Sequence, residues 1–131
     1  MPNGFSGTME EFKEKELPLK RIDKKLLSFS IKHMVKIQKN YHNWPSRSLY
    51  WGIFFRRKMQ IYLSWKNKNR YNFWICARFD KGKKRYLKDE FLKKDVDFKE
   101  IENNLDDLLE EGREKLKSWD RKDLTKVSDL R

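Results

Sequence analysis

The chain of 131 residues contains few of the residues that cross-link or sharply bend a protein: one cysteine, three prolines and five glycines. A single cysteine, Cys76, cannot form an internal disulfide, so we expect a protein of a reducing compartment. With two histidines beside that cysteine, a zinc site is not expected. The glycines do not frame a loop ahead of a helix, which excludes a glycine-rich phosphate-binding loop. We therefore expect no metal and no cofactor.

Long hydrophobic runs are also missing. The longest, residues 49–55, is interrupted by Gly52 and is far shorter than a segment that crosses a bilayer. Near the N-terminus, Glu10 and Glu11 stand where a signal peptide would carry a basic stretch followed by an apolar one. We therefore expect a cytoplasmic protein with no membrane contact.

Hydrophobic residues are scarce, 37% against 40% charged, and such a balance can leave a chain disordered. Aromatic residues nevertheless make up 15% of the chain, and disordered chains are poor in them because large rings bury much surface. The length suits one modest hydrophobic core. We predict a single domain over residues 1–131, with flexible ends at residues 1–8 and 120–131.

Acidic residues are nearly absent from the middle of the chain. Residues 19–94 contain 22 basic residues against four acidic ones, whereas both flanking segments carry a small excess of acid, so the net charge is +12. From Arg47 to Lys88, Asp80 is the one acid among 13 basic residues. Charge segregated in this way produces a surface patch that attracts a polyanion. A lysine-rich genome composition without selection for binding is the alternative interpretation.

The spacing of apolar residues predicts an α+β fold. Apolar residues at helical spacing cover residues 22–40, and a second such stripe follows the capping signal of Asp97 and Glu100 over residues 98–118. A short helix from Met9 should end before Pro18, because the residue before a proline disfavours helical geometry. Between the two long helices the period changes to two residues, which predicts an antiparallel four-stranded β-meander over residues 48–87.

The strands are expected at residues 48–56, 59–65, 71–79 and 83–87. The first two should be joined by a turn at residues 56–58, and the last two by a hairpin turn at residues 80–82 with Gly82 in the left-handed position. Cys76 lies in the middle of a strand, where a buried, unreactive thiol is the usual state.

Alternation along the strands assigns the two faces of the sheet. The core face should carry Leu49, Trp51, Ile53, Phe55, Met59, Ile61, Leu63, Trp65, Phe73, Ile75, Ala77 and Phe79. The other face should then carry aromatic rings among cations: Tyr50, Phe54, Arg56, Lys58, Tyr62, Trp74, Arg78, Lys84 and Tyr86. An uncovered face of this composition can stack bases and pair with phosphates. Burial of both faces, or a β-bulge that exchanges them, is the alternative.

The candidate nucleic-acid- or anion-binding residues are Arg47, Arg56, Arg57, Lys58, Lys66, Lys68, Arg70, Arg78, Lys81, Lys83, Lys84 and Arg85, and the candidate stacking residues are Tyr50, Tyr62, Trp74 and Tyr86. The leading hypothesis is a non-catalytic domain that binds RNA or DNA, or docks on a nucleoprotein complex, through a basic surface on residues 47–88.

Two further hypotheses stay open. The alternative is a small protein-interaction module, such as an inhibitor or immunity-type protein, that binds an acidic protein partner. The third is a metal-independent ribonuclease in which His42, Arg47, Arg56, Arg57 and Tyr62 converge to move a proton and stabilise phosphate charge.

Overall fold

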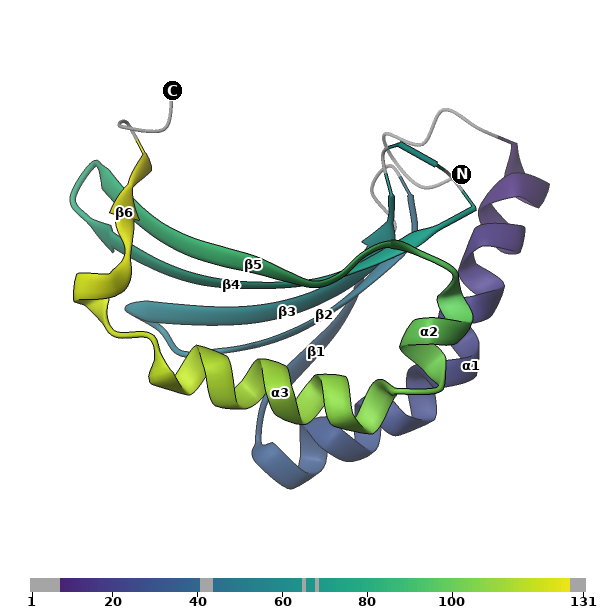
Figure 1. The fold of residues 1–131 in the computed structure, drawn as a ribbon, viewed down its shortest axis with the longest axis horizontal. Coiled ribbons are helices and arrows are strands. Elements are labelled where there is room, and N and C mark those ends of the chain that lie inside the picture. Colours follow the sequence, from purple (N-terminus) through teal and green to yellow (C-terminus); the bar gives the residue numbers. More distant parts are fainter. Residues whose placement is uncertain (1–7, 41–43, 65, 68, 128–131) are drawn as a thin grey trace.

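The computed structural model describes residues 8–40, 44–64, 66, 67 and 69–127. Its elements are α1 (Met9–His33), β1 (Lys36–Asn40), β2 (Ser46–Trp51), β3 (Phe55–Leu63), β4 (Tyr71–Lys81), β5 (Lys84–Val96), α2 (Phe98–Glu102), α3 (Leu105–Ser118), the short 3-10 helix η1 (Arg121–Asp123) and β6 (Thr125–Lys126). The strands form one antiparallel sheet in chain order from β1 to β6. Helices α1 and α3 lie on the same side of this sheet (Figure 1).

The predicted α+β class, with an antiparallel meander between N-terminal and C-terminal helices, is confirmed. The described residues contain six strands instead of the predicted four. Strand β1 arises from residues expected to be helical, and β6 from residues expected to be flexible. Strand β5 also runs to Val96, well past the predicted end of the meander. None of the helices among the described residues is both long and apolar enough to cross a membrane.

Helix α1 begins at the predicted start but does not stop at Pro18. Thr8 and Glu11 form a capping box, in which the Glu11 N–H donates to Thr8 Oγ1 at 3.1 Å. Pro18 then lies inside one helix of 25 residues, although a proline there removes a hydrogen bond and costs about 3 kcal/mol. The prediction of a break was wrong because buried side chains on both sides of the proline, Phe12 and Leu19 among them, hold both halves of the helix against the sheet.

The same helix ends earlier than predicted. Met34 takes a left-handed conformation with φ 55° and donates its N–H to the Ser30 carbonyl, which ends α1 at His33. The prediction of a helix to residue 40 was wrong because the apolar residues Val35 and Ile37 suit helical spacing and strand alternation equally well. Backbone pairing with β2 makes residues 36–40 a strand.

The turn between β2 and β3 lies at residues 52–54, so the predicted turn at residues 56–58 was wrong. Gly52 has φ 90°, and a Cβ atom at this position would lie 2.2 Å from the Phe55 carbonyl oxygen. Glycine is therefore required there, and β3 begins directly after the turn. As a result Ile53, expected in the core, is 77% exposed. Gly82 takes the predicted left-handed conformation, with φ 62°.

The core lies between the sheet and the helices. Leu105, Leu109 and Leu116 of α3 are buried in the same cluster as Met59 and Ile75 of the sheet. The predicted C-terminal helix is divided into α2 and α3. At Gly112, a Cβ atom would lie 2.7 Å from Met59 Sδ, so glycine permits the close approach of α3 to β3.

Candidate nucleic-acid interface

The pairing register of the strands assigns each side chain to one face of the sheet. Leu49, Met59, Ile61, Leu63, Phe73, Ile75 and Ala77 are buried on the helix side, as predicted. Their neighbours along each strand point the other way, where Figure 1 shows no helix. We call this surface the open face. It comprises Lys36, Gln38, Asn40, Ser46, Ser48, Tyr50, Arg56, Lys58, Gln60, Tyr62, Asn72, Trp74, Cys76, Arg78, Asp80, Arg85, Leu87, Asp89 and Phe91.

Aromatic rings lie near the centre of the open face. Trp74 on β4 is the pairing partner of Gln60 on β3 and of Phe91 on β5. Tyr50, Tyr62 and Trp74 are half-buried, and Phe91 is 38% exposed. Ser48 on β2, a small residue beside Tyr50, is buried. The arrangement can offer more than one ring to a stacking ligand.

Trp74 is held in place by polar contacts on two sides. Its Nε1 donates a hydrogen bond to Asp89 Oδ2 at 2.8 Å, and Lys58 Nζ lies 5.5 Å from the centre of its ring. Burial raises the pKa of the nearby Tyr62 hydroxyl above its usual value, although a hydrogen bond with Asn72 partly opposes the shift. These contacts orient the rings before any ligand arrives.

Positive charge gathers at one end of the open face. Lys36, Arg56, Lys58, Arg78 and Arg85 all lie toward the end where β4 turns into β5. Exposed Lys81 and Lys83 extend this cluster into the turn. At the opposite end the open face carries uncharged groups, including Asn40, Ser46, Tyr62 and Asn72.

The open face carries two carboxylates, and only Asp80 is neutralised by cations among the described residues. Arg78 Nη2 lies 2.9 Å from Asp80 Oδ2, and Arg85 Nε lies 3.5 Å from Asp80 Oδ1. The hydrogen bond from Arg78 and the charges of both arginines hold the pKa of Asp80 below its usual value. Exposed pairs of this kind add little stability, but they fix the arginine side chains across the surface.

A hollow of about 360 Å³ lies in the cationic half of the open face, within the roughly 300–1,000 Å³ range of ligand pockets. Tyr50, Trp74 and Leu87 line it together with Gln38 and five basic residues, Arg56, Arg57, Lys58, Arg78 and Arg85. The buried thiol of Cys76 also contributes, and burial raises its pKa to about 11. The thiol is therefore protonated near neutral pH, so the hollow presents cations and aromatic rings but no thiolate nucleophile.

Arg47, a predicted anion-binding residue, is 1% exposed and lies on the helix side. Its Nε donates to Asp23 Oδ1 at 2.7 Å and its Nη2 to Glu16 Oε2 at 3.1 Å, both on α1. Burial alone would lower the pKa of Arg47, but these two carboxylates raise it. Arg47 therefore leaves the set of surface cations, because α1 neutralises its charge in the interior.

Three other candidates also lie off the open face. Arg57 points toward α3, where Nε donates to the Leu116 carbonyl at 2.7 Å and Nη2 to the Trp119 carbonyl at 3.2 Å. Burial lowers its pKa. By strand alternation Lys84 and Tyr86 lie on the helix side, and the Tyr86 ring centre is 6.2 Å from that of Phe79. The turns lie at other residues than predicted. This changes the place of Arg57, Lys84 and Tyr86 in the strand alternation, and therefore the face on which each side chain lies.

The predicted single patch on residues 47–88 is divided by the fold. Exposed Lys66 and Arg70 lie where β4 begins, and Arg70 Nη1 already donates to the Asp95 carbonyl at 3.0 Å. Lys81 and Lys83 lie at the other end of β4, a strand of 11 residues, which spans about 35 Å. Lys68, His42 and Trp65 lie outside the described residues.

The prediction did not place Lys36, Asp89 or Phe91 on this face of the sheet. Lys36 was assigned to a helix, and β5 was expected to end at residue 87, before Asp89 and Phe91. The charged run of residues 88–90 hides the strand, because lysine and acidic residues are poor strand formers. Gln60 was placed on the correct face but was given no role.

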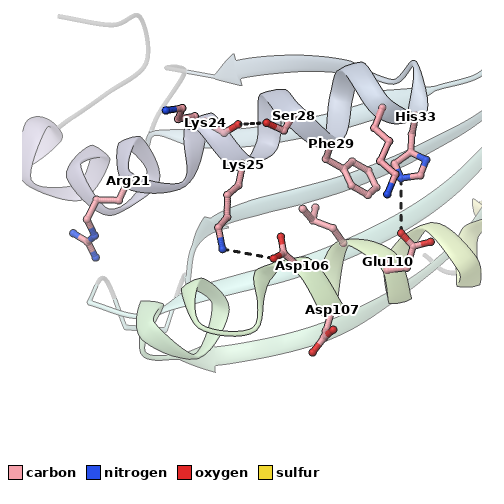
Figure 2. A pocket seen from close by; sticks show the side chains of 11 residues that line it. Arg21, Lys24, Lys25, Ser28, Phe29, His33, Asp106, Asp107 and Glu110 are labelled. Atoms are coloured by element: carbon pink, nitrogen blue, oxygen red, sulfur yellow. Dashed lines mark hydrogen bonds and ion pairs between the residues drawn. The ribbon is translucent and has the colours of Figure 1, made fainter.

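A larger hollow of about 870 Å³ lies between α1 and α3. Figure 2 shows Lys25 of α1 pointing to Asp106 of α3, and His33 pointing to Glu110. Lys25 Nζ lies 3.7 Å from Asp106 Oδ2, and His33 Nε2 lies 3.8 Å from Glu110 Oε2. Burial lowers the pKa of His33, so its imidazole is mostly neutral near pH 7. Basic and acidic side chains face each other across this groove, which lacks the excess of one charge seen on the open face.

The residues of the ribonuclease hypothesis do not converge among those that the structure describes. Arg47 is buried and Arg57 caps α3. Arg56 and Tyr62 share the open face but stand six residues apart on β3, which separates them by about 20 Å. In the described ranges, no group of three or more His, Cys, Asp or Glu residues is placed to hold a metal ion.

Comparisons of the chain with protein-family models, with curated proteins and with solved structures found no match.

Proposed function

We propose that this protein binds single-stranded nucleic acid through the open face of its sheet. The observation that carries the proposal is the open face itself, on which no described helix packs and where four aromatic side chains lie beside five basic ones. Rings stack on bases of any sequence, and cations pair with phosphates. A duplex hides its base faces, so the unpaired form suits this surface better.

The division of the open face supports the same proposal. Phosphates would pair with Lys58, Arg56 and Arg78 at the cationic end, while bases would stack on Trp74 and Tyr62 toward the uncharged end. A nucleic-acid single strand that crosses the sheet from one edge to the other presents its phosphates on one side and its bases on the other. The hollow beside Trp74 has the volume of a small-ligand site, and it would hold one nucleotide.

The test is a titration of short labelled single strands, of about ten nucleotides, across a salt series. The logarithm of the affinity should fall linearly with the logarithm of the salt concentration, by about 0.7 for each phosphate contact. Duplexes of the same sequence should bind more weakly. An absence of binding to single strands at low salt would overturn the proposal.

Trp74→Ala separates stacking from charge. The affinity for single strands should fall roughly 5- to 150-fold, the equivalent of about 1–3 kcal/mol for one stacked base, while the salt dependence stays the same. Lys117→Ala removes an exposed charge from α3, on the covered side of the sheet, and should leave affinity almost unchanged. An unfolding curve for each variant shows that the protein stays folded.

A second candidate function, a protein-interaction module, is favoured by a different feature. Ile31, Met34, Ile53 and Phe54 are each 71–90% exposed. Because Lys36 pairs with Tyr50, Met34 and Ile53 lie near the same end of the sheet. Exposed large apolar side chains often mark a binding surface for another protein. If Phe54→Ser leaves oligonucleotide binding unchanged while Trp74→Ala weakens it, the two surfaces are independent.

A further inference from the structure

The open face places hydrogen-bond acceptors on both sides of Trp74. On one side, Asp89 Oδ2 accepts the Trp74 Nε1–H at 2.8 Å. On the other, Gln60 is the pairing partner of Trp74, and its Nε2 donates to Ser46 Oγ at 3.4 Å. Within the described residues, Asp89 Oδ1 and Gln60 Oε1 accept no hydrogen bond. Both oxygens therefore remain available to a ligand.

Asp89 differs from the other carboxylate of the open face. Asp80 is paired with Arg78 and Arg85, whereas no basic side chain of the described residues forms a salt bridge with Asp89. An unpaired negative charge weakens the attraction of this surface for phosphates unless the carboxylate contacts the ligand itself. The hydrogen bond from Trp74 holds Asp89 at the edge of the ring on which a base would stack.

The bases differ in what they offer to such an acceptor. Cytosine, adenine and guanine carry an exocyclic amino group, which donates hydrogen bonds. Where cytosine and adenine carry this group, uracil and thymine carry a carbonyl oxygen, and so does guanine, whose amino group lies at another position. An ionised carboxylate can only accept. With the exocyclic group of the base beside Asp89 Oδ1, an amino group donates to the carboxylate, whereas a carbonyl oxygen meets it acceptor to acceptor, which is unfavourable. The N3–H through which uracil and thymine can donate lies at a different position on the base.

We infer that the open face selects bases with an exocyclic amino group over uracil and thymine, and that Asp89 is the residue that determines this preference. The inference rests on the proposed function, because it concerns the base stacked on Trp74. Gln60 plays a weaker part, since rotation of its amide group can present either a donor or an acceptor.

The experiment compares oligocytidine and oligouridine RNA of equal length by fluorescence anisotropy, at low salt and near neutral pH. These strands have the same backbone and ring size. Oligocytidine should bind about tenfold more tightly, the effect of about 1.4 kcal/mol that one hydrogen bond to a charged group can supply. Asp89→Asn should bring the two affinities close together, mainly by strengthening the binding of oligouridine, because an amide can also donate.

Asp80→Asn is the matched control. It removes the same charge from the same face, but at a site that is paired with arginines and lies away from Trp74. The affinities for both strands should change together, and their ratio should stay as in the unmodified protein.

Equal binding of the two strands by the unmodified protein would overturn the inference. A tenfold preference that persists in Asp89→Asn would also overturn it, because selection would then not depend on Asp89. Neither result resembles a failure of the proposed function, in which both strands would fail to bind at low salt.

Discussion

Arg47 on β2 donates a hydrogen bond from Nε to Asp23 Oδ1 on α1 at 2.7 Å, and its guanidinium is almost completely buried between sheet and helix. Glu16, one of the buried residues of α1, accepts a second hydrogen bond from the same group at 3.1 Å. A buried charge needs partners, because desolvation without them costs several kcal/mol. The contacts of Arg47 with Asp23 and Glu16 therefore hold α1 against β2. They also determine which side of the sheet the helix covers.

Replacing Arg47 with methionine should destabilise the protein strongly. The change keeps much of the side-chain volume but leaves Glu16 and Asp23 without their buried partner, which costs about 3–5 kcal/mol. Urea unfolding measures the loss. Arg56→Met on the open face is the control, and its free energy of unfolding should change by no more than about 0.5 kcal/mol. Similar small losses for both variants would contradict the structural role of Arg47.

Acidification should weaken this contact through Asp23. Burial by itself would raise the pKa of Asp23, but its interactions with Arg47 and Lys39 hold the pKa below the ordinary value of 3.8. Because the folded state has the lower pKa, the stabilisation is present above about pH 4 and is lost as the pH falls through the folded-state value. The difference in free energy of unfolding between the unmodified protein and Asp23→Asn should therefore shrink below about pH 4. A constant difference would show that Asp23 is not ionised in the fold.

Arg57 and Lys58 should give opposite results, although they are adjacent in the chain. Arg57→Ala removes two hydrogen bonds to the end of α3 and should cost about 1–3 kcal/mol of stability, with no change in the salt dependence of nucleic-acid binding. Lys58→Ala should cost less than about 1 kcal/mol but reduce the salt slope by about 0.7. Urea unfolding and the salt titration measure the two effects. If Arg57→Ala also reduced the slope, Arg57 would have to reach the ligand.

Two glycines allow a matched test of the turns. Gly82 has space around it for a Cβ atom, so Gly82→Ala should cost about 1–2 kcal/mol for its left-handed backbone alone. At Gly52 a Cβ atom would collide with the Phe55 carbonyl oxygen at 2.2 Å. Gly52→Ala should therefore cost more, on the order of 3 kcal/mol. Thermal or urea unfolding measures the loss of stability in each variant. Equal losses would contradict the position of the β2–β3 turn at Gly52.

Several elements could be predicted because their signals are local. The capping box of Thr8 and Glu11, the left-handed Gly82, and the alternation of Met59, Ile61 and Leu63 all depend on neighbours within a few residues. The break at Pro18 could not be judged in this way, since packing against the sheet on both sides of the proline outweighs its cost. The strand at residues 36–40 was missed because its apolar spacing suits two structures, and pairing with β2 decides between them.

The candidate site shows the same division. The sequence alone determined that the middle of the chain is basic and aromatic, because composition does not depend on the fold. Only the tertiary structure decided which of those side chains reach a common surface. A shift in the position of one turn placed Arg57 toward α3, and burial against α1 removed Arg47 from the surface. Pairing along β5 added Asp89 and Phe91 to the open face, because contacts between strands distant in sequence are set by backbone register.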